Sequence, residues 1–305
     1  MAVQREIWVD YIIGNLFKDN DILSKAYRED DYVLGGKVVH IPQAGPKPVI
    51  VKDRSTLPAT ASERTDTDIT YPLEWYSSDP IRIRNAEQAE LSYEKMQSVL
   101  GETMEAFQDR MADEMIIKWL VGAIDASNIQ LTTGANAAAK VAGQTGTRKV
   151  LTVNDVKALA LKFNLQNIAK NDRVLLLESN LLDELTSDLS ITQSRDFSQY
   201  FDASKGIVGK LFGFEIMERS NVGIVNAAND TVDAYGAAIA ATDHVAALAF
   251  QKNSVAVARG EVNFFENKQD ALHYGDVHSA DVRFGGRARR TNAEGVFALV
   301  QAPGA

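Results

Sequence analysis

Cysteine is absent from the 305-residue chain, which excludes disulfide bonds, thiol catalysis, iron–sulfur clusters and cysteine-bound zinc. This composition fits a protein made in a reducing cytoplasm. No stretch approaches the roughly 20 consecutive apolar residues of a transmembrane helix. Residues 1–6 do not read as the start of a secretory signal, so none is expected. We therefore expect no membrane partner.

Basic residues are outnumbered: 32 Lys and Arg oppose 41 Asp and Glu, for a net charge of −9 at pH 7. Broad binding to nucleic acid depends on neutralising phosphates with basic side chains, so this balance argues against it and leaves only weak or local contact open. The 45% hydrophobic and 24% charged fractions are ordinary for globular proteins. The chain can bury a sizeable core in one large domain or two ordinary ones.

The sequence also lacks the motifs of the common enzyme classes. It has no G-x-S-x-G, G-x-G-x-x-G or H-E-x-x-H pattern. Residues 206–210 superficially resemble a phosphate-binding loop, but the segment is too short and Leu211 follows where Ser or Thr is required. We predict a turn into a strand there, and no catalytic or cofactor-binding residues.

Only two of the four histidines lie close together in sequence, His273 and His278, with Asp276 and Asp281 nearby. A separation of five residues points the two rings to different faces of either a strand or a helix. We therefore expect exposed or singly hydrogen-bonded histidines and no metal site.

Proline is scarce and unevenly placed, with six of the seven prolines between residues 42 and 80. Residues 37–41 and 49–51 are expected to be extended, and Ile69, Tyr71, Leu73 and Trp75 alternate as one face of a returning strand. The pattern predicts a β-hairpin arm, with prolines restricting it to edge-type pairing. An arm of about 16 residues reaches roughly 50 Å. Because an isolated hairpin is marginal in water, its expected packing partner is another subunit.

A long amphipathic helix is predicted from about residue 86 to residue 121, after a capping-box-like start at Asn85. It would extend about 54 Å. Its apolar residues recur at spacings of three and four. They are Ala89, Tyr93, Met96, Leu100, Met104, Phe107, Met111 and Met115.

The rest of the chain predicts a loop followed by mixed helices and strands. Residues 126–149 are small and polar, which favours a flexible surface connection. A helix capped by Thr152 should place Val156, Leu159 and Phe163 on one face. Strands are expected over residues 173–177, 210–217, 245–250, 255–258, 277–290 and 296–300, with a helix capped by Ser179 after the first of them.

Arginines form one dense basic group near the C-terminus, at Arg283, Arg287, Arg289 and Arg290. Such a group contacts either DNA phosphate or acidic side chains. In an acidic chain the second alternative is favoured, with the carboxylates of a neighbouring subunit as partners.

The order of these elements resembles that of the major capsid proteins of tailed double-stranded DNA bacteriophages, which have the HK-ninety-seven fold. The resemblance covers nearly the whole chain and implies an α+β fold. It rests on loose patterns at residues 57–60 with 70–73, the helix from Asn85, and residues 173–177, 209–216 and 249–258. The implied parts are an N-arm (1–33), an extended hairpin or E-loop (34–84), a peripheral domain with the long helix and C-terminal strands (85–150 and 261–305) and an axial domain (151–260).

The resemblance implies assembly and not catalysis. Copies of the chain would form pentamers and hexamers of an icosahedral or prolate virion shell, built in the bacterial cytoplasm around weakly contacted double-stranded DNA. A portal and a separate scaffold protein are the other expected partners. Two alternatives stay open, the shell of an encapsulin-type nanocompartment and a cytoplasmic enzyme of unknown class.

Inter-subunit contacts are expected at the tip and base of the hairpin and at the arginine group. The charged tip residues would set the register of the arm on the next subunit. The candidates are Asp53, Arg54, Glu63, Arg64, Tyr71, Trp75, Arg82, Arg84, Arg283, Arg287, Arg289 and Arg290.

Overall fold

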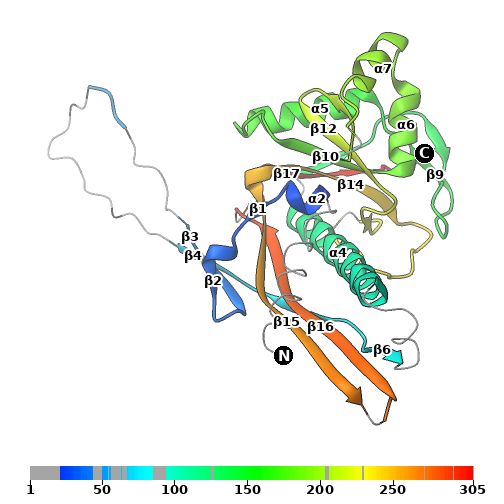
Figure 1. The fold of residues 1–305 in the computed structure, drawn as a ribbon. Coiled ribbons are helices and arrows are strands. Elements are labelled where there is room, and N and C mark those ends of the chain that lie inside the picture. Colours follow the sequence, from blue (N-terminus) through cyan, green and yellow to red (C-terminus); the bar gives the residue numbers. More distant parts are fainter. Residues whose placement is uncertain are drawn as a thin grey trace.

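The computed structural model describes residues 21–43, 50–53, 55, 63, 67–84, 94–124, 127–202, 206–228, 230–270, 272–290 and 292–304. These residues form an α+β structure with a wide sheet at one end and a long two-stranded ladder at the other (Figure 1). This confirms the predicted fold class. None of the helices in these ranges is both long and apolar enough to cross a bilayer.

A seven-stranded sheet forms the centre of the wide end. Its strand order is β11-β12-β10-β14-β17-β7, and β13 pairs with the end of β14. The sheet is mixed, because β10 runs parallel to β12 and antiparallel to β14. The strands are β7 (Ile129–Leu131), β10 (Arg173–Glu178), β11 (Ile207–Leu211), β12 (Phe214–Arg219), β13 (Ile224–Val225), β14 (His244–Gln251) and β17 (Val296–Val300).

Helices cover both faces of this sheet, so its central strands are apolar without interruption. Successive residues of β10 point to opposite faces: Leu176 packs with helix α4 (Glu94–Ala123), and Leu175 packs with α5 (Val153–Leu165). Helix α6 (Ser179–Asp188) shares the α5 side, and α7 (Ile191–Ser198) packs against β11. All six residues of β10 are buried.

The second sheet is built on a long antiparallel pair, β15 (Val255–Asp270) and β16 (Gly275–Ala288). β1 (Tyr27–Arg28) extends it on the β15 side. β5 (Glu74–Ser77) and β6 (Ile81–Arg84) pair in turn with β16 on the other side. Figure 1 shows this sheet reaching away from the central sheet.

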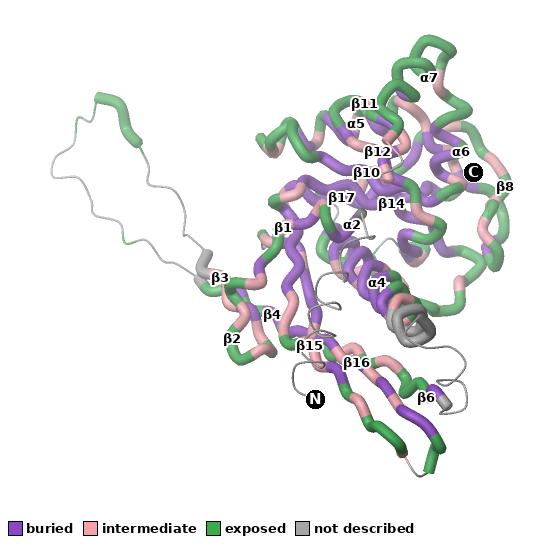
Figure 2. The backbone as a smooth tube through the Cα atoms, in the orientation of Figure 1, coloured by how far each residue is buried: buried purple, intermediate pink, exposed green. Residues whose placement is uncertain are grey.

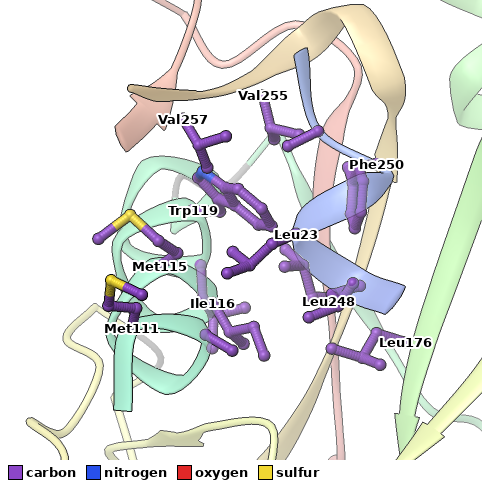
Figure 3. Packing of buried hydrophobic residues seen from close by; sticks show 14 of the residues in the cluster. Leu23, Met111, Met115, Ile116, Trp119, Leu176, Leu248, Phe250, Val255 and Val257 are labelled. Carbon is purple, nitrogen blue, oxygen red and sulfur yellow. The ribbon is translucent and has the colours of Figure 1, made fainter. Parts of the chain in front are cut away.

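One hydrophobic core joins the two sheets through α4. Trp119 is fully buried and packs with Phe250 of the central sheet and Val257 of the long pair (Figure 3). Its Nε1 donates a hydrogen bond to the carbonyl oxygen of Ala256 at 3.4 Å. Leu23 of the short helix α2 (Asp21–Ser24) fills the same site. The predicted helical stripe is confirmed at Met104, Phe107, Met111 and Met115, all buried.

Three short strands form a separate sheet at the start of the arm, β2 (Val33–Leu34), β3 (Val38–Gln43) and β4 (Thr67–Pro72). The β3–β4 pairing confirms the start of the predicted hairpin. Residues 50–53 lie far from the body of the molecule (Figure 1). Ile50 and Val51 are in no strand, contrary to expectation.

Two further predictions within the hairpin and helix need adjustment. The returning strand is not continuous, because β4 and β5 are separated at Leu73, and Trp75 is exposed while Ile69, Tyr71 and Leu73 are buried. Helix α4 is described from Glu94, so the predicted start near residue 86 lies outside the described residues.

The prediction of one strand over residues 210–217 was wrong. β11 and β12 are two antiparallel strands joined at Phe212 and Gly213, which have φ values of 48° and 89°. Two consecutive positive φ values are typical of a tight hairpin turn that matches strand twist. The alternation of apolar residues continues through the turn and hides it. Similarly, α6 is capped by the side chain of Glu178, which accepts from the Asn180 amide at 3.1 Å, and not by Ser179.

The flexible connection predicted over residues 126–149 was also wrong. β7 lies in the central sheet, and β8 (Asn136–Ala138) pairs with β9 (Thr147–Lys149). The buried guanidinium of Arg148 donates to the carbonyl oxygens of Ala241 and Asp243 at 3.1 and 3.0 Å, which holds this hairpin on the body. The helix capped by Thr152 and the strand at Arg173 are confirmed.

The residue ranges assigned to the axial and peripheral domains remain predictions. The central sheet draws on both ranges, because β7 and β17 lie outside residues 151–260 and pair with each other beside β14.

Replacing Trp119 by alanine is expected to lower the free energy of unfolding by about 3–5 kcal/mol, because it opens a cavity where α4 meets both sheets. Urea unfolding followed by circular dichroism measures the change. Val121→Ala is the matched control, because Val121 is on the same helix and is 55% exposed. Equal effects of the two substitutions would contradict the central role of Trp119.

Candidate subunit interface

The base of the arm is fixed tightly to the long strand pair. Val39, Tyr71 and Leu73 pack against Ala258 of β15, and all four are buried. At Gly285 of β16, an added Cβ would lie 3.0 Å from the Leu73 side chain and 3.0 Å from the Pro72 carbonyl oxygen. Only glycine allows this close approach without displacing the arm.

A buried carboxylate connects the arm base to the C-terminal arginine group. Glu29 is fully buried, accepts from Arg289 Nε at 2.6 Å and accepts from the Tyr71 hydroxyl at 3.1 Å. The Arg289 guanidinium also lies 4.2 Å from the centre of the Tyr27 ring. Burial and the neighbouring Glu29 charge raise the pKa of Tyr71, so its hydroxyl stays protonated and donates. Tyr71 and Arg289 thus both donate to Glu29 within their own subunit, at the base of the arm.

Beyond its base, the described part of the arm is exposed (Figure 2). Ile50 is 93% exposed, and Val51 is also exposed although apolar. The candidate residues Asp53 and Glu63 are exposed as well. Neither has a hydrogen-bond or ion-pair partner among the described residues. The candidates Arg54 and Arg64 lie outside the described residues.

Candidates at the sheet edge occupy the side of β16 on which the arm begins. Trp75 is 61% exposed and donates from Nε1 to Asp281 at 2.9 Å. In the β5–β16 register, Trp75 is directly opposite Arg283, which is partly exposed. Arg82 is exposed and donates to the His273 carbonyl oxygen at 3.4 Å. Arg84 is on β6, and its side chain lies outside the described set.

The four C-terminal arginines differ in the partners that their side chains contact. Arg287 donates to the Ala288 carbonyl oxygen at 2.9 Å, and Arg290 pairs loosely with Glu294 at 3.6 Å. Arg289 is engaged by Glu29. Arg289 is therefore engaged in a close ion pair within the subunit, whereas Arg290 is exposed and Arg283 and Arg287 are partly exposed.

A groove of about 640 Å³ lies between β5–β6 and the N-terminal half of α4. Its walls combine aromatic and aliphatic side chains with a few charged ones. No local pattern predicts this groove, because it depends on two segments whose relative position is set by tertiary packing. It is lined by Trp75, Tyr76, Ser77, Ser78, Asp79, Ile81, Glu102, Thr103, Ala106, Phe107 and Arg110.

Sequence reasoning also missed the exposed apolar residues at the two ends of the molecule. Ile191, at the start of α7, is 92% exposed, and Phe201 is 64% exposed beyond that helix. Leu272 and Tyr274, at the turn between β15 and β16, are 85% and 81% exposed. Their short segments have too few residues for a periodic pattern to distinguish an exposed face from a buried one.

The two neighbouring histidines have different surroundings. His273 is exposed and lies 3.1 Å from Asp270. His278 is buried and stacks on Phe264 with ring centres 5.7 Å apart, and within the described ranges neither of its nitrogens has a hydrogen-bond partner. The expectation of an exposed or singly bonded ring is thus wrong for His278. Among the described residues no group of three or more His, Asp or Glu side chains could hold a metal ion.

Comparison with known proteins gives matches only at the level of structure. No protein-family model and no curated protein matches the chain. The capsid of Ralstonia phage GP4 matches with a TM-score of 0.64 and 12% identity, over 92% of this chain and 87% of that chain. The capsid of cyanophage P-SCSP1u gives 0.61 and 18% identity, over 92% and 87%.

A virus-like particle from Pyrococcus furiosus matches over 97% of this chain and 98% of that chain, with a TM-score of 0.53 and 10% identity. At these identities the likeness shows the fold. The chain has the fold of tailed-phage capsid proteins, the HK-ninety-seven fold predicted from the sequence.

Lowering the pH from about 7 to about 5 is expected to reduce the free energy of unfolding, in part through His278. Burial lowers its pKa, while Glu266 and Asp276 raise it and Lys268 lowers it. The unfolded chain therefore binds a proton at this histidine at a higher pH than the folded chain does. The free energy of unfolding decreases as the pH drops below the pKa of His278 in the unfolded chain. Urea unfolding at several pH values should show a smaller loss for His278→Phe than for wild type. His273→Phe is the control, and the same slope in all three proteins would contradict the prediction.

Proposed function

We propose that the chain is the major capsid protein of a tailed bacteriophage. In this role it assembles into pentamers and hexamers of a shell that encloses double-stranded DNA. The observation that carries the proposal is the match to phage capsids over about nine-tenths of the chain. The exposed arm supports it, because Ile50 and Val51 extend into solvent where a neighbouring subunit would cover them.

The proposed mechanism is assembly through many weak contacts and not catalysis. A subunit in a closed shell contacts several neighbours, so modest contact energies add up to a stable particle. The arm would lie across the adjacent subunit, with Asp53, Arg54, Glu63 and Arg64 setting its register. Exposed groups at the sheet edge, such as Trp75, Arg82 and Arg283, are further proposed contacts, and Arg84, Arg287 and Arg290 complete the set.

The proposed partners follow from this role. The net charge of −9 favours weak contact with packaged DNA, because strong phosphate binding would need a basic surface. A portal protein and a separate scaffold protein are proposed as further partners. We place assembly in the host cytoplasm and the mature protein in the virion.

Expression of the chain in bacteria, alone and with its neighbouring genes, followed by negative-stain electron microscopy, tests this proposal. Closed shells of uniform size are expected. A product that sediments only as monomers or dimers in every combination would contradict assembly and favour the alternative of a cytoplasmic enzyme.

A second candidate is the shell of an encapsulin-type nanocompartment. The near-complete coverage of the Pyrococcus furiosus virus-like particle favours it, although with a lower TM-score than the phage capsids. The contents of particles isolated from the native source distinguish the two. Nuclease-protected double-stranded DNA supports the phage capsid, whereas a co-purifying folded enzyme without DNA supports the nanocompartment.

Reversing two charges on the arm, Arg54→Glu with Arg64→Glu, is expected to abolish or strongly reduce shell formation while the subunit stays folded. Like charges would then face each other across the contact, which disfavours pairing. Sedimentation velocity measures assembly, and circular dichroism checks the fold.

The matched control for the arm variant is Lys157→Glu with Lys170→Glu, which makes the same charge change at exposed positions of and near α5. This variant is expected to assemble. Intact shells from the arm variant would show that these arginines do not set the register.

A further inference from the structure

The groove between β5–β6 and α4 has the composition of a binding surface. Phe107 and Tyr76 form apolar walls, and Trp75 and Ile81 at the rim are 61% and 37% exposed. Arg110 and Glu102 lie at the α4 side of the opening. Exposed aromatic side chains that line a hollow of about 640 Å³ are costly in water and typical of a site that another segment covers.

The floor of the groove contains a second, independent sign of a missing partner. A smaller cavity below it is lined by Phe264 and His278 and shares Ser78, Ile81 and Thr103 with the groove. His278 is 4% exposed, and neither of its ring nitrogens has a hydrogen-bond partner among the described residues. A neutral imidazole carries one N–H donor and one acceptor, and buried polar groups normally find partners. A segment that enters the groove could supply a backbone carbonyl or amide to this ring.

The chain has an apolar segment of suitable size near its N-terminus. Residues 7–17 read IWVDYIIGNLF, in which eight of the eleven side chains are hydrophobic. Trp8, Ile12 and Leu16 recur at a spacing of four, as do Val9, Ile13 and Phe17, which would place both rows on one side of a helix. Such a segment needs an apolar surface to cover it.

The point of attachment brings this segment within reach of the groove. Leu23 is anchored beside Trp119 in the core (Figure 3). Phe107 in the groove wall precedes Trp119 by twelve residues of α4, a distance of about 18 Å along the helix. Because α2 begins at Asp21, the four residues from Phe17 to Asp21 span up to about 14 Å when extended, and the two helical residues to Leu23 add about 3 Å. Tethering at this distance also gives a high effective concentration of the segment at the groove.

We propose that residues 7–17 dock in this groove of their own subunit, with their apolar rows against Phe107, Tyr76 and Trp75. The inference does not depend on shell formation, because both segment and groove belong to one chain. The competing occupant is the arm of a second copy, which presents Ile50 and Val51. The two occupants differ in which part of the chain approaches Ala106, an exposed residue of the groove wall.

Cross-linking can test this directly, since the natural chain contains no cysteine. The full chain with Ile12→Cys and Ala106→Cys is treated with a short bismaleimide, and the product is resolved by mass. We expect an efficient cross-link within single chains. The control pair Ile12→Cys with Leu161→Cys, at an exposed position of α5, should give little product.

The pair Ile50→Cys with Ala106→Cys tests the competing occupant. A cross-link between two chains in this variant, together with no cross-link from position 12 to position 106, would overturn the proposal. So would a cross-link from position 12 to position 106 that joins only different chains.

Maleimide labelling of Ala106→Cys gives a second readout that needs no cross-link. Its labelling is expected to be about tenfold slower than that of Glu105→Cys, which is exposed on the same helix outside the groove lining. Adding Ile12→Asp and Ile13→Asp should remove that protection, whereas adding Ile50→Asp and Val51→Asp should leave it unchanged. Equal labelling at positions 105 and 106 in the otherwise natural chain, with circular dichroism showing a folded protein, would also refute docking.

Discussion

The burial of helix α4 against two sheets at once is the constraint on which the architecture depends. At 30 residues the helix is about 45 Å long, and its apolar stripe cannot be covered by either sheet alone. Trp119 and Ile116 meet the central sheet, and Met115 and Met111 continue the stripe toward the long strand pair (Figure 3). The relative position of the two sheets is therefore fixed by one continuous core.

The arm is packed against the body at its base and exposed beyond it. Its base is locked where Leu73 approaches Gly285 and where Glu29 accepts hydrogen bonds from Tyr71 and Arg289. Its far part has exposed apolar side chains such as Ile50. A fixed base and an exposed far part suit an arm that contacts the next subunit in a defined orientation. This is why we favour a shell over a solitary protein.

Much of the interior could be predicted from local patterns. Val156, Leu159 and Phe163 recur at helical spacing after a capping residue, and residues 173–177 are a continuous apolar strand, so both segments were correctly identified. The failures have two causes, a local turn that the alternation of apolar residues hides and contacts between residues that are distant in sequence. The strand at 210–217 was divided by a turn at Phe212, and the loop at 126–149 was ordered by Arg148 reaching carbonyl groups near residue 242.

The candidate interface, too, could be predicted from the sequence only in part. Charged residues on the arm were identifiable because proline and charge patterns alone predict an exposed hairpin. In the arginine group, in contrast, Arg289 pairs with Glu29 and Arg290 with Glu294, and a count of basic residues reveals neither contact. The groove beside α4 arises only when β5 and β6 are placed next to the helix through their pairing with β16.

The sequence by itself determined the classes of chemistry that are excluded, the long amphipathic helix, the proline-bearing arm and the order of elements that resembles phage capsid proteins. These features depend on composition and on periodicities of two and 3.6 residues, which are local properties of a chain. Only the tertiary structure decided which arginines are engaged, that His278 is buried with no hydrogen-bond partner in the described part of the chain, and that a groove lies beside α4. Those outcomes depend on contacts between residues up to 260 positions apart, such as Glu29 with Arg289, and no local pattern encodes them.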